Sequence, residues 1–234
     1  MGNTYRAVEI SAPGTFRAVE RTVTTPGPGQ VRIRVEACGV CHSDAATVEA
    51  QFPGLSYPRV PGHEAIGRIE EIGSGVATWK VGQRVGVGFF GGEDGTCVAC
   101  RRGESAYCQN PIMTGITTDG GYAEMMIAEA RALVLIPDEL KSEDAAPLVC
   151  AGVTTFNALR NAGRAGDTVA IQGIRGLATS VYSSREKWAF AQWQLVEDPT
   201  RSISRTSWGR IFTLTPRPRM QRQHFKNSAA PRSS

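Results

Sequence analysis

Alternation of apolar and polar residues predicts short β-strands in the first 140 residues of the chain. Residues 31–36 place three aliphatic side chains between two arginines and a glutamate, which is the period-two pattern of a strand with one buried face. Further short apolar runs are bounded by glycine or proline. They cover residues 62–72, 81–87, 121–128 and 133–136. Because the spacing has no helical period, the pattern predicts a β-barrel-like domain.

The pattern changes after Pro137. Ser142 precedes two acidic residues, and this is typical of a helix N-terminus because a hydroxyl caps free amides and acids suit the positive end. The helix predicted from there carries Cys150 and Phe156 and ends near Gly163. Residues 167–173 then have the composition of a buried parallel strand that runs into a glycine turn. The chain as a whole is therefore predicted to be mixed α/β.

Composition narrows the class of protein. The hydrophobic share of 41% and the charged share of 21% are those of an ordinary globular protein. No apolar run is long enough to cross a membrane, and the first residues lack the apolar core of a secretory signal. Six cysteines in such a chain indicate a reducing compartment and metal ligation rather than disulfides. We therefore expect a cytoplasmic protein without a membrane partner.

Two short motifs collect most of the residues that bind soft metals. Cys38-Gly39-Val40-Cys41-His42-Ser43-Asp44 and Pro61-Gly62-His63-Glu64 hold two of the six cysteines and two of the three histidines. A catalytic zinc uses three protein ligands and leaves the fourth position open, so we predict Cys41, His63 and Cys150 as ligands and Cys38 as a bystander. The alternative is that these cysteines are small core residues and that His63 is a hydrogen-bonded core histidine.

The neighbours of these ligands have suitable chemistry. Asp44 and Glu64 could accept a hydrogen bond from an imidazole, which is the usual support for a metal-bound histidine. Ser43, adjacent to Cys41 and His42, could carry a proton away from an alcohol whose pKa is lowered by zinc. The motif therefore predicts Ser43, His42, Glu64 and Asp44 as residues of a catalytic site.

These motifs, together with residues 148–159 (LVCAGVTTFNAL), resemble those of the zinc-dependent, medium-chain alcohol dehydrogenases. The resemblance covers about residues 5–177, with the three motifs in the family's order and spacing. It implies a GroES-like catalytic domain over residues 1–150 and the start of a Rossmann coenzyme domain over 151–177. It also implies that Cys41, His63 and Cys150 bind the catalytic zinc, that Glu64 can approach it, and that His42 lies near the coenzyme pyrophosphate. Ser43 would begin a proton relay, which several relatives end with a histidine where this chain has Ala46.

The resemblance extends to a second cysteine cluster. Cys97, Cys100 and Cys108 have the spacing of the family's structural zinc lobe, which normally contains four cysteines. Asp94 stands at the first position, and a carboxylate can ligate zinc, so Asp94, Cys97, Cys100 and Cys108 are the predicted structural zinc ligands. The alternative is that Asp94-Gly95 is only a turn and that the lobe holds no metal.

The resemblance ends where a dinucleotide-binding loop should follow the strand at 167–173. Gly173 and Gly176 match the glycine fingerprint that contacts a pyrophosphate, but Arg175 stands at its second glycine position and Ala178 at its third. Residues 1–177 hold 16 basic and 19 acidic side chains, whereas residues 178–234 hold 10 and 3, with 1 of the 26 glycines. Residues 178–234 are therefore interpreted as a disordered or frameshifted tail. Reading codons from Leu177 two bases later permits the sequence GHLSIQFAREMGFRTVAIGRGSDK, which has the helix and strand that a Rossmann fold requires.

The function predicted from this resemblance is oxidoreduction of an alcohol and an aldehyde or ketone, with zinc and either NAD or NADP. The interrupted fingerprint predicts little turnover by the chain as given. A non-catalytic zinc-binding remnant is the alternative, and a zinc-free quinone reductase is disfavoured by Cys41, His63 and Cys150. The basic tail lacks the motif spacing of a nucleic-acid-binding segment, so no nucleic acid partner is expected. Family members form homo-oligomers largely through the coenzyme domain.

Overall fold

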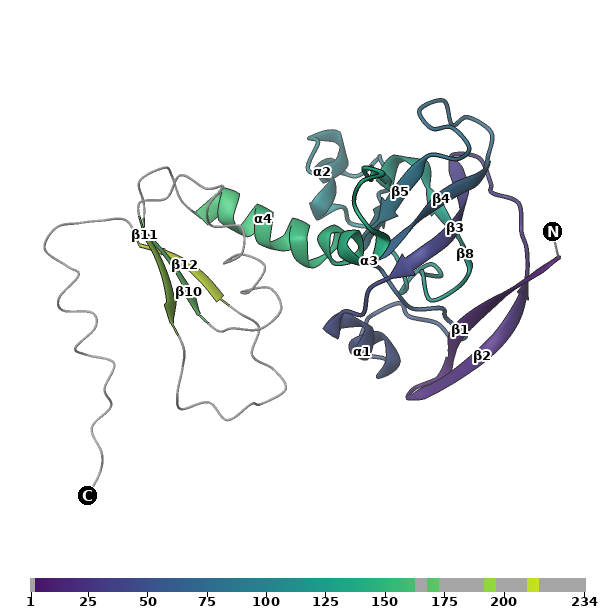
Figure 1. Cartoon of the computed structure of the whole chain (residues 1–234), viewed down its shortest axis with the longest axis horizontal. Helices are drawn as coiled ribbons and strands as arrows, with labels where there is room; N and C mark the ends of the chain where they lie inside the picture. The colour runs from purple at the N-terminus through teal and green to yellow at the C-terminus, as the bar shows by residue number, and fades with distance from the viewer. Residues whose placement is uncertain (1–2, 163–167, 173–191, 197–209, 215–234) are drawn as a thin grey trace, which may run out of the picture. The chain divides into compact units, whose positions relative to one another are not determined.

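The computed structural model describes residues 3–162, 168–172, 192–196 and 210–214 (Figure 1). It divides the chain into two compact units, Met1–Cys150 and Ala151–Ser234. Each unit has its own sheet structure and is described separately below.

A five-stranded antiparallel sheet forms the centre of the first unit, with strand order β8-β3-β4-β5-β9. Figure 1 shows β3, β4 and β5 side by side. The sheet buries aliphatic side chains that include Val31, Ile33, Ile69 and Val85. Its strands are β3 (Gln30–Cys38), β4 (Ala65–Ile72), β5 (Arg84–Val87), β8 (Met125–Glu129) and β9 (Val134–Leu135).

The β1–β2 hairpin, the antiparallel pair of β6 and β7, and several short helices complete this unit. The β1–β2 hairpin contacts the rest of the unit through backbone hydrogen bonds from Val8 to Tyr122 and between Ile10 and Arg59. The strands of these two pairs are β1 (Thr4–Ala12) with β2 (Thr15–Thr22), and β6 (Phe90–Gly92) with β7 (Ile112–Met113). The helices are α1 (His42–Val48), α2 (Val98–Arg101), α3 (Ser142–Ala145) and the 3-10 turns η1 (Ser105–Tyr107), η2 (Ala130–Ala132) and η3 (Ala146–Val149).

The second unit begins with the helix α4 (Ala151–Ala162). Its strand β10 (Thr168–Gln172) lies between β11 (Gln192–Val196), which runs parallel to it, and β12 (Arg210–Leu214), which runs antiparallel. The strand predicted at 167–173 is thus present as β10. No strand was predicted in 178–234, where β11 and β12 lie. Gly173, Gly176 and the fingerprint departures at Arg175 and Ala178 lie outside the described residues, as does the proposed frame change.

The helix predicted from Ser142 to Gly163 is wrong in two respects. It is broken into α3, η3 and α4, because Cys150 has φ −127° and ψ −76° and Pro147 stands at the start of η3. The N-cap is Lys141 rather than Ser142. The hydroxyl of Ser142 instead donates to Glu36 Oε2 at 2.6 Å and accepts from Arg84 Nη2 at 2.7 Å, so tertiary partners replace the local cap.

Candidate metal centre

Four side chains from three separate segments converge at one point of the first unit. One ligand atom from each of Cys41, His63, Glu64 and Cys150 lies within 4.8 Å of the others. Cys41 is the N-cap of α1, His63 and Glu64 directly precede β4, and Cys150 follows η3. The structure therefore brings together the three predicted ligands and Glu64.

Cys41 is positioned by the turn that connects β3 to α1. The backbone N–H of Cys41 donates to Asp44 Oδ2 at 2.8 Å, which fixes the first turn of the helix. Gly39 donates its N–H to the Glu64 carbonyl at 3.0 Å. A Cβ at Gly39 would lie 2.0 Å from Glu64 Oε2, so only glycine lets the carboxylate occupy this space.

His63 is held by a close crossing of two backbone segments. Gly120 and Tyr122 donate their N–H groups to Val60 and Pro61, and a Cβ at Gly120 would lie 2.2 Å from the carbonyl oxygen of Gly62. The imidazole is 2% exposed and meets the ring of Phe89 edge-on, with the centroids 5.1 Å apart. These contacts leave the imidazole little freedom to turn.

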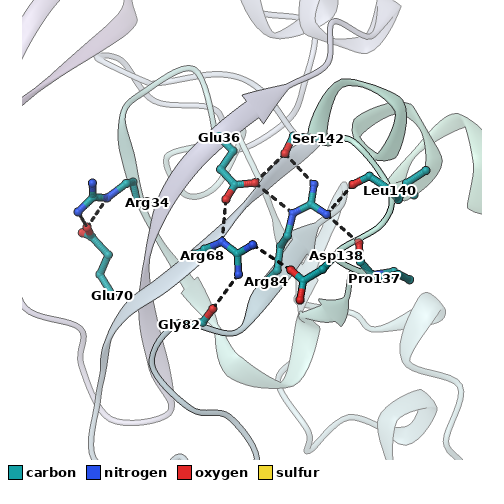
Figure 2. Close-up of polar contacts among 10 residues, drawn as sticks. All are labelled: Arg34, Glu36, Arg68, Glu70, Gly82, Arg84, Pro137, Asp138, Leu140 and Ser142. Atoms are coloured by element: carbon teal, nitrogen blue, oxygen red, sulfur yellow. Dashed lines mark hydrogen bonds and ion pairs between the residues drawn. The ribbon is translucent and has the colours of Figure 1, made fainter.

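Cys150 is positioned from strand β5 and the residues next to it. The guanidinium of Arg84 donates to the carbonyls of Pro137 at 2.7 Å and Leu140 at 2.5 Å, and it also binds Ser142 and Glu36 (Figure 2). A Cβ at Gly86 would lie 2.8 Å from Val149 Cγ1, and one at Gly88 would lie 2.5 Å from the Val149 carbonyl oxygen. Because Gly86 and Gly88 have no side chains, η3 can approach them closely, and this contact fixes the position of Cys150.

The electrostatics of the four residues favour a bound cation. Asp44 Oδ1 lies 3.2 Å from His63 Nδ1, which leaves Nε2 buried without a hydrogen-bond partner among the described residues. Burial lowers the pKa of His63, but Asp44 and Cys41 outweigh it and raise that pKa to about 9. The thiol of Cys150, whose Sγ is 3.9 Å from Cys41 Sγ, lowers the pKa of Cys41, whereas its own pKa is raised by the same contact. Burial and the charge of Cys41 raise the pKa of Glu64.

This donor set fits zinc. Two thiolates and an imidazole are ligands that zinc prefers, and the orphaned Nε2 is the nitrogen that a metal would use while Asp44 supports Nδ1. Binding would release protons from Cys150 and His63, so the affinity for metal should depend on pH. Cys38 is not part of the cluster: burial and packing against Gly62 and Gly121 make it a core residue with a pKa raised to about 12. His42 and Ser43 form the first positions of α1, next to Cys41.

A second cluster lies in the loop between β6 and β7. One ligand atom from each of Asp94, Cys97, Cys100 and Cys108 lies within 4.8 Å of the others. The backbone N–H groups of Asp94 and Asn110 each donate to Cys108 Sγ at 3.4 Å, so two hydrogen bonds hold this sulfur in place. Asp94 accepts the N–H groups of Thr96 and Cys97, and these bonds, led by the one from Cys97, lower its pKa. The carboxylate is therefore ionised, and one of its oxygens lies within 4.8 Å of the three sulfur atoms.

Sequence reasoning did not identify three residues that shape the first cluster. Tyr122 donates its hydroxyl to Asp44 Oδ2 at 2.8 Å, Arg84 binds the segment before Cys150, and Phe89 packs on His63. Local sequence carries no signal for such contacts, since Tyr122 and Asp44 are 78 positions apart. Of the predicted coenzyme contacts, the exposed His42 is described, whereas Gly173 and Gly176 are not.

Comparison with known proteins identifies the first unit. The alcohol dehydrogenase GroES-like domain matches residues 27–138. Alcohol dehydrogenase patD of Aspergillus clavatus is 46% identical over 173 residues, covering 74% of this chain and 44% of that protein. The NADP-dependent alcohol dehydrogenase C of Mycobacterium bovis is 40% identical over 183 residues, covering 74% of this chain and 52% of that protein.

A solved alcohol dehydrogenase structure is also similar to this chain. The cobalt- and zinc-bound thermostable alcohol dehydrogenase from Pyrobaculum aerophilum matches with a TM-score of 0.74 and 30% identity, over 82% of this chain and 60% of that one. The chain spans about half the length of the curated relatives it matches. No described helix has the length and apolar character needed to cross a bilayer. Over residues 27–138 the chain therefore contains an alcohol dehydrogenase GroES-like domain, and it is related to the zinc-bound alcohol dehydrogenases.

Proposed function

We propose that this chain supplies the zinc-binding domain of an alcohol dehydrogenase, with Cys41, His63 and Cys150 as the catalytic zinc ligands. The observation that carries the proposal is the convergence of these three side chains with Glu64 around the orphaned Nε2 of His63. Buried polar atoms are rarely left without a partner, and a metal ion would provide one here. The substrate class is a small alcohol, or the corresponding aldehyde or ketone.

Zinc bound at this centre would supply Lewis-acid polarisation of the alcohol oxygen. The residues of the chain have separate roles in the proposal. Ser43 takes part in removing the alcohol proton, and Asp44 holds His63 in the tautomer that exposes Nε2. Glu64 lies close enough to the ligand atoms to approach the metal, and burial together with the charge of Cys41 raises the pKa of its carboxyl. With Ala46 in place of a terminal relay histidine, the proton leaves Ser43 by another route.

The hydride acceptor is proposed to be NAD or NADP, in keeping with the NADP-dependent relative from Mycobacterium bovis. His42, Gly173 and Gly176 are the proposed contacts of its pyrophosphate. The 234-residue polypeptide is expected to oxidise alcohols slowly or not at all, because the side chain of Arg175 would obstruct the phosphate. Calorimetric titration with NAD and NADP separates a weak enzyme from a non-catalytic zinc-binding remnant, since a remnant would bind neither.

A second, structural zinc is proposed at Asp94, Cys97, Cys100 and Cys108. Support comes from the four converging ligand atoms and from the backbone N–H groups directed at Cys108. Both zinc sites require reduced thiols, and all six cysteines are free. This chemistry suits a reducing compartment, and we assign the protein to the cytoplasm on that ground.

Metal analysis of variants tests the proposed centres. The purified chain is expected to hold two zinc ions, Cys150→Ser one, and Cys108→Ser one. Cys38→Ser is the matched control, because Cys38 is close to the centre yet outside the cluster, and it should retain two ions. A chain that binds no zinc, or one in which Cys38→Ser and Cys150→Ser lose the same ion, would contradict the assignment of ligands.

A further inference from the structure

We propose that Tyr122 is a positioning residue of the metal centre, acting through Asp44 on His63. The inference rests on the proposed zinc site and extends it to a residue that contacts no ligand atom in the cluster. The three side chains form a chain of contacts: Tyr122 Oη donates to Asp44 Oδ2 at 2.8 Å, and Asp44 Oδ1 lies 3.2 Å from His63 Nδ1.

The two carboxylate oxygens of Asp44 have different partners. Oδ2 accepts the backbone N–H of Cys41 at 2.8 Å as well as the Tyr122 hydroxyl. Oδ1 is buried without a hydrogen-bond partner among the described residues, and its one ion-pair contact there is the 3.2 Å approach to His63 Nδ1. The two donors on Oδ2 therefore fix the rotation of the carboxylate, and this fixes the oxygen that the imidazole meets.

The hydroxyl of Tyr122 is committed to this carboxylate. Its only other acceptor in the described structure is the Gly39 carbonyl at 3.4 Å, which is 0.6 Å farther than Asp44 Oδ2. One proton serves one short bond, so Asp44 receives it. Asp44 is 6% exposed, and water cannot readily replace a donor that is removed there.

The ring of Tyr122 has a separate, structural role. It packs against Gly62, where an added Cβ would lie 2.6 Å from the ring, and its backbone carbonyl accepts from Val8. Tyr122→Phe keeps the ring and these contacts and removes only the hydroxyl. The substitution therefore separates the proposed positioning role from packing.

The loss of the Tyr122 hydroxyl should weaken zinc binding at this site alone. Removing a partner that orients a metal-bound histidine lowers metal affinity by about 10–100-fold. The Tyr122 hydroxyl is one of two donors to Asp44 Oδ2, so its removal should lower the affinity for zinc by about tenfold. The chain contains only three histidines, so labelling their imidazoles with ¹⁵N gives few signals. The other cluster contains no histidine, so a shift on zinc binding comes from the centre of Cys41 and His63, and the imidazole that becomes a ligand there is that of His63.

The experiment is a chelator titration of the zinc-loaded, full-length chain, followed by the His63 imidazole signals. Tyr122→Phe is expected to release zinc from His63 at a free zinc concentration about tenfold higher than the concentration at which wild type releases it. Tyr57→Phe is the matched control: its hydroxyl donates to the Thr47 carbonyl at 2.9 Å, at the other end of the same helix, and contacts no metal ligand. The control should titrate like wild type.

A second variant keeps the test decisive. Asp44→Asn should weaken the site at least as much, and adding Tyr122→Phe to it should cause no further loss, because the hydroxyl acts through Asp44. Tyr122→Phe that titrates like wild type, that unfolds, or that loses zinc from both clusters equally would overturn the inference. If the His63 imidazole signals of the wild-type chain do not change when zinc is added, the proposed metal centre itself is contradicted.

Discussion

At Gly62 both the backbone conformation and the packing of the metal site disfavour a side chain. Its φ is +97°, and a Cβ there would lie 2.6 Å from the Tyr122 ring and 2.9 Å from Cys38 Sγ. Gly62→Ala is therefore expected to lower the free energy of unfolding by about 3 kcal/mol, from backbone strain and overpacking together. Urea denaturation measures the change.

The control for this substitution is Gly75→Ala. Gly75 has a similar φ of +79°, but no described atom lies within 4 Å of its added Cβ. Only the backbone strain of about 1 kcal/mol should appear. Equal losses for the two variants would show that packing around Gly62 is looser than the structure indicates.

Single residues also show where sequence reasoning reaches its limit. Scarce histidines placed beside cysteines were enough to indicate a metal site, because ligand chemistry restricts residue type, and the resemblance to the family indicated His63 and the second cluster. Tyr122 and Arg84 have no such restriction, since many residue types donate hydrogen bonds. Tyr122 reaches Asp44, 78 positions away, and the partners of Arg84 are 48 or more positions away, so only the fold reveals these contacts.

Strand β5 links the sheet to the segment that ends in Cys150, and Arg84 makes the connection. Its side chain is 5% exposed and donates to two carbonyls, a hydroxyl and a carboxylate. Lysine cannot reproduce this planar set of donors, so Arg84→Lys should cost about 3 kcal/mol of unfolding free energy. Arg68→Lys, which shares the partner Glu36 but is 46% exposed, should cost less than about 1 kcal/mol.

Thermal and urea unfolding of the two variants provide the measurement, and zinc content adds a second. Because the Arg84 contacts hold the chain eight residues before Cys150, Arg84→Lys should also weaken zinc at His63. Comparable stability of the two lysine variants would count against Arg84 as the residue that holds this segment (Figure 2).

The connection between β5 and the segment before Cys150 also depends on pH, because Glu36 is part of it. Burial raises the pKa of this carboxyl, but the hydrogen bonds from Ser142 and Arg84 and the charge of Arg68 outweigh it, so the pKa falls below its ordinary 4.5. A lowered folded-state pKa stabilises the protein above the unfolded-state value and stops doing so as pH falls through the folded-state value. Glu36→Gln should therefore cost about 1–2 kcal/mol at pH 7 and progressively less below pH 4.5.

The check is the difference in unfolding free energy between wild type and Glu36→Gln, measured from pH 7 to pH 3. Zinc release at low pH affects both proteins and cancels in the difference. A difference that stays constant across this range would mean that the charge of Glu36 does not stabilise the fold.

At the level of elements, the sequence predicted the strands that have regularly placed apolar residues and missed elements that lack such a pattern. The cores of β3, β4 and β5 follow from regular apolar positions. The β1–β2 hairpin was missed because β2 is mostly exposed on both faces and shows little alternation. The break at Cys150 was missed because an unbroken helix satisfies the same apolar pattern, and the contacts of Val149 with Gly86 and Gly88 decide between the two.

At the scale of the whole molecule, the core clusters and candidate ligands of the described residues lie in the first unit. Two aliphatic clusters and both groups of candidate ligands fall between residues 31 and 150 of the part of the chain that the structure describes. The strands described in the second unit pair only with one another. The change in charge and glycine content near residue 177 falls entirely within that second unit, so it leaves the ligands and the residues that position them unaltered.

A fragment of residues 1–162 should therefore fold and bind zinc like the 234-residue chain. It contains the whole first unit and all of α4, so Cys150 does not become a chain end. We expect two zinc ions per fragment, released from His63 at the same chelator concentration as in the longer chain. Zinc analysis and the His63 imidazole signals provide the readout, and the fragment with Cys150→Ser, which should hold one ion, is the control. A fragment that keeps the zinc of the Asp94 cluster but loses that of His63 would show that the second unit helps to form the metal centre.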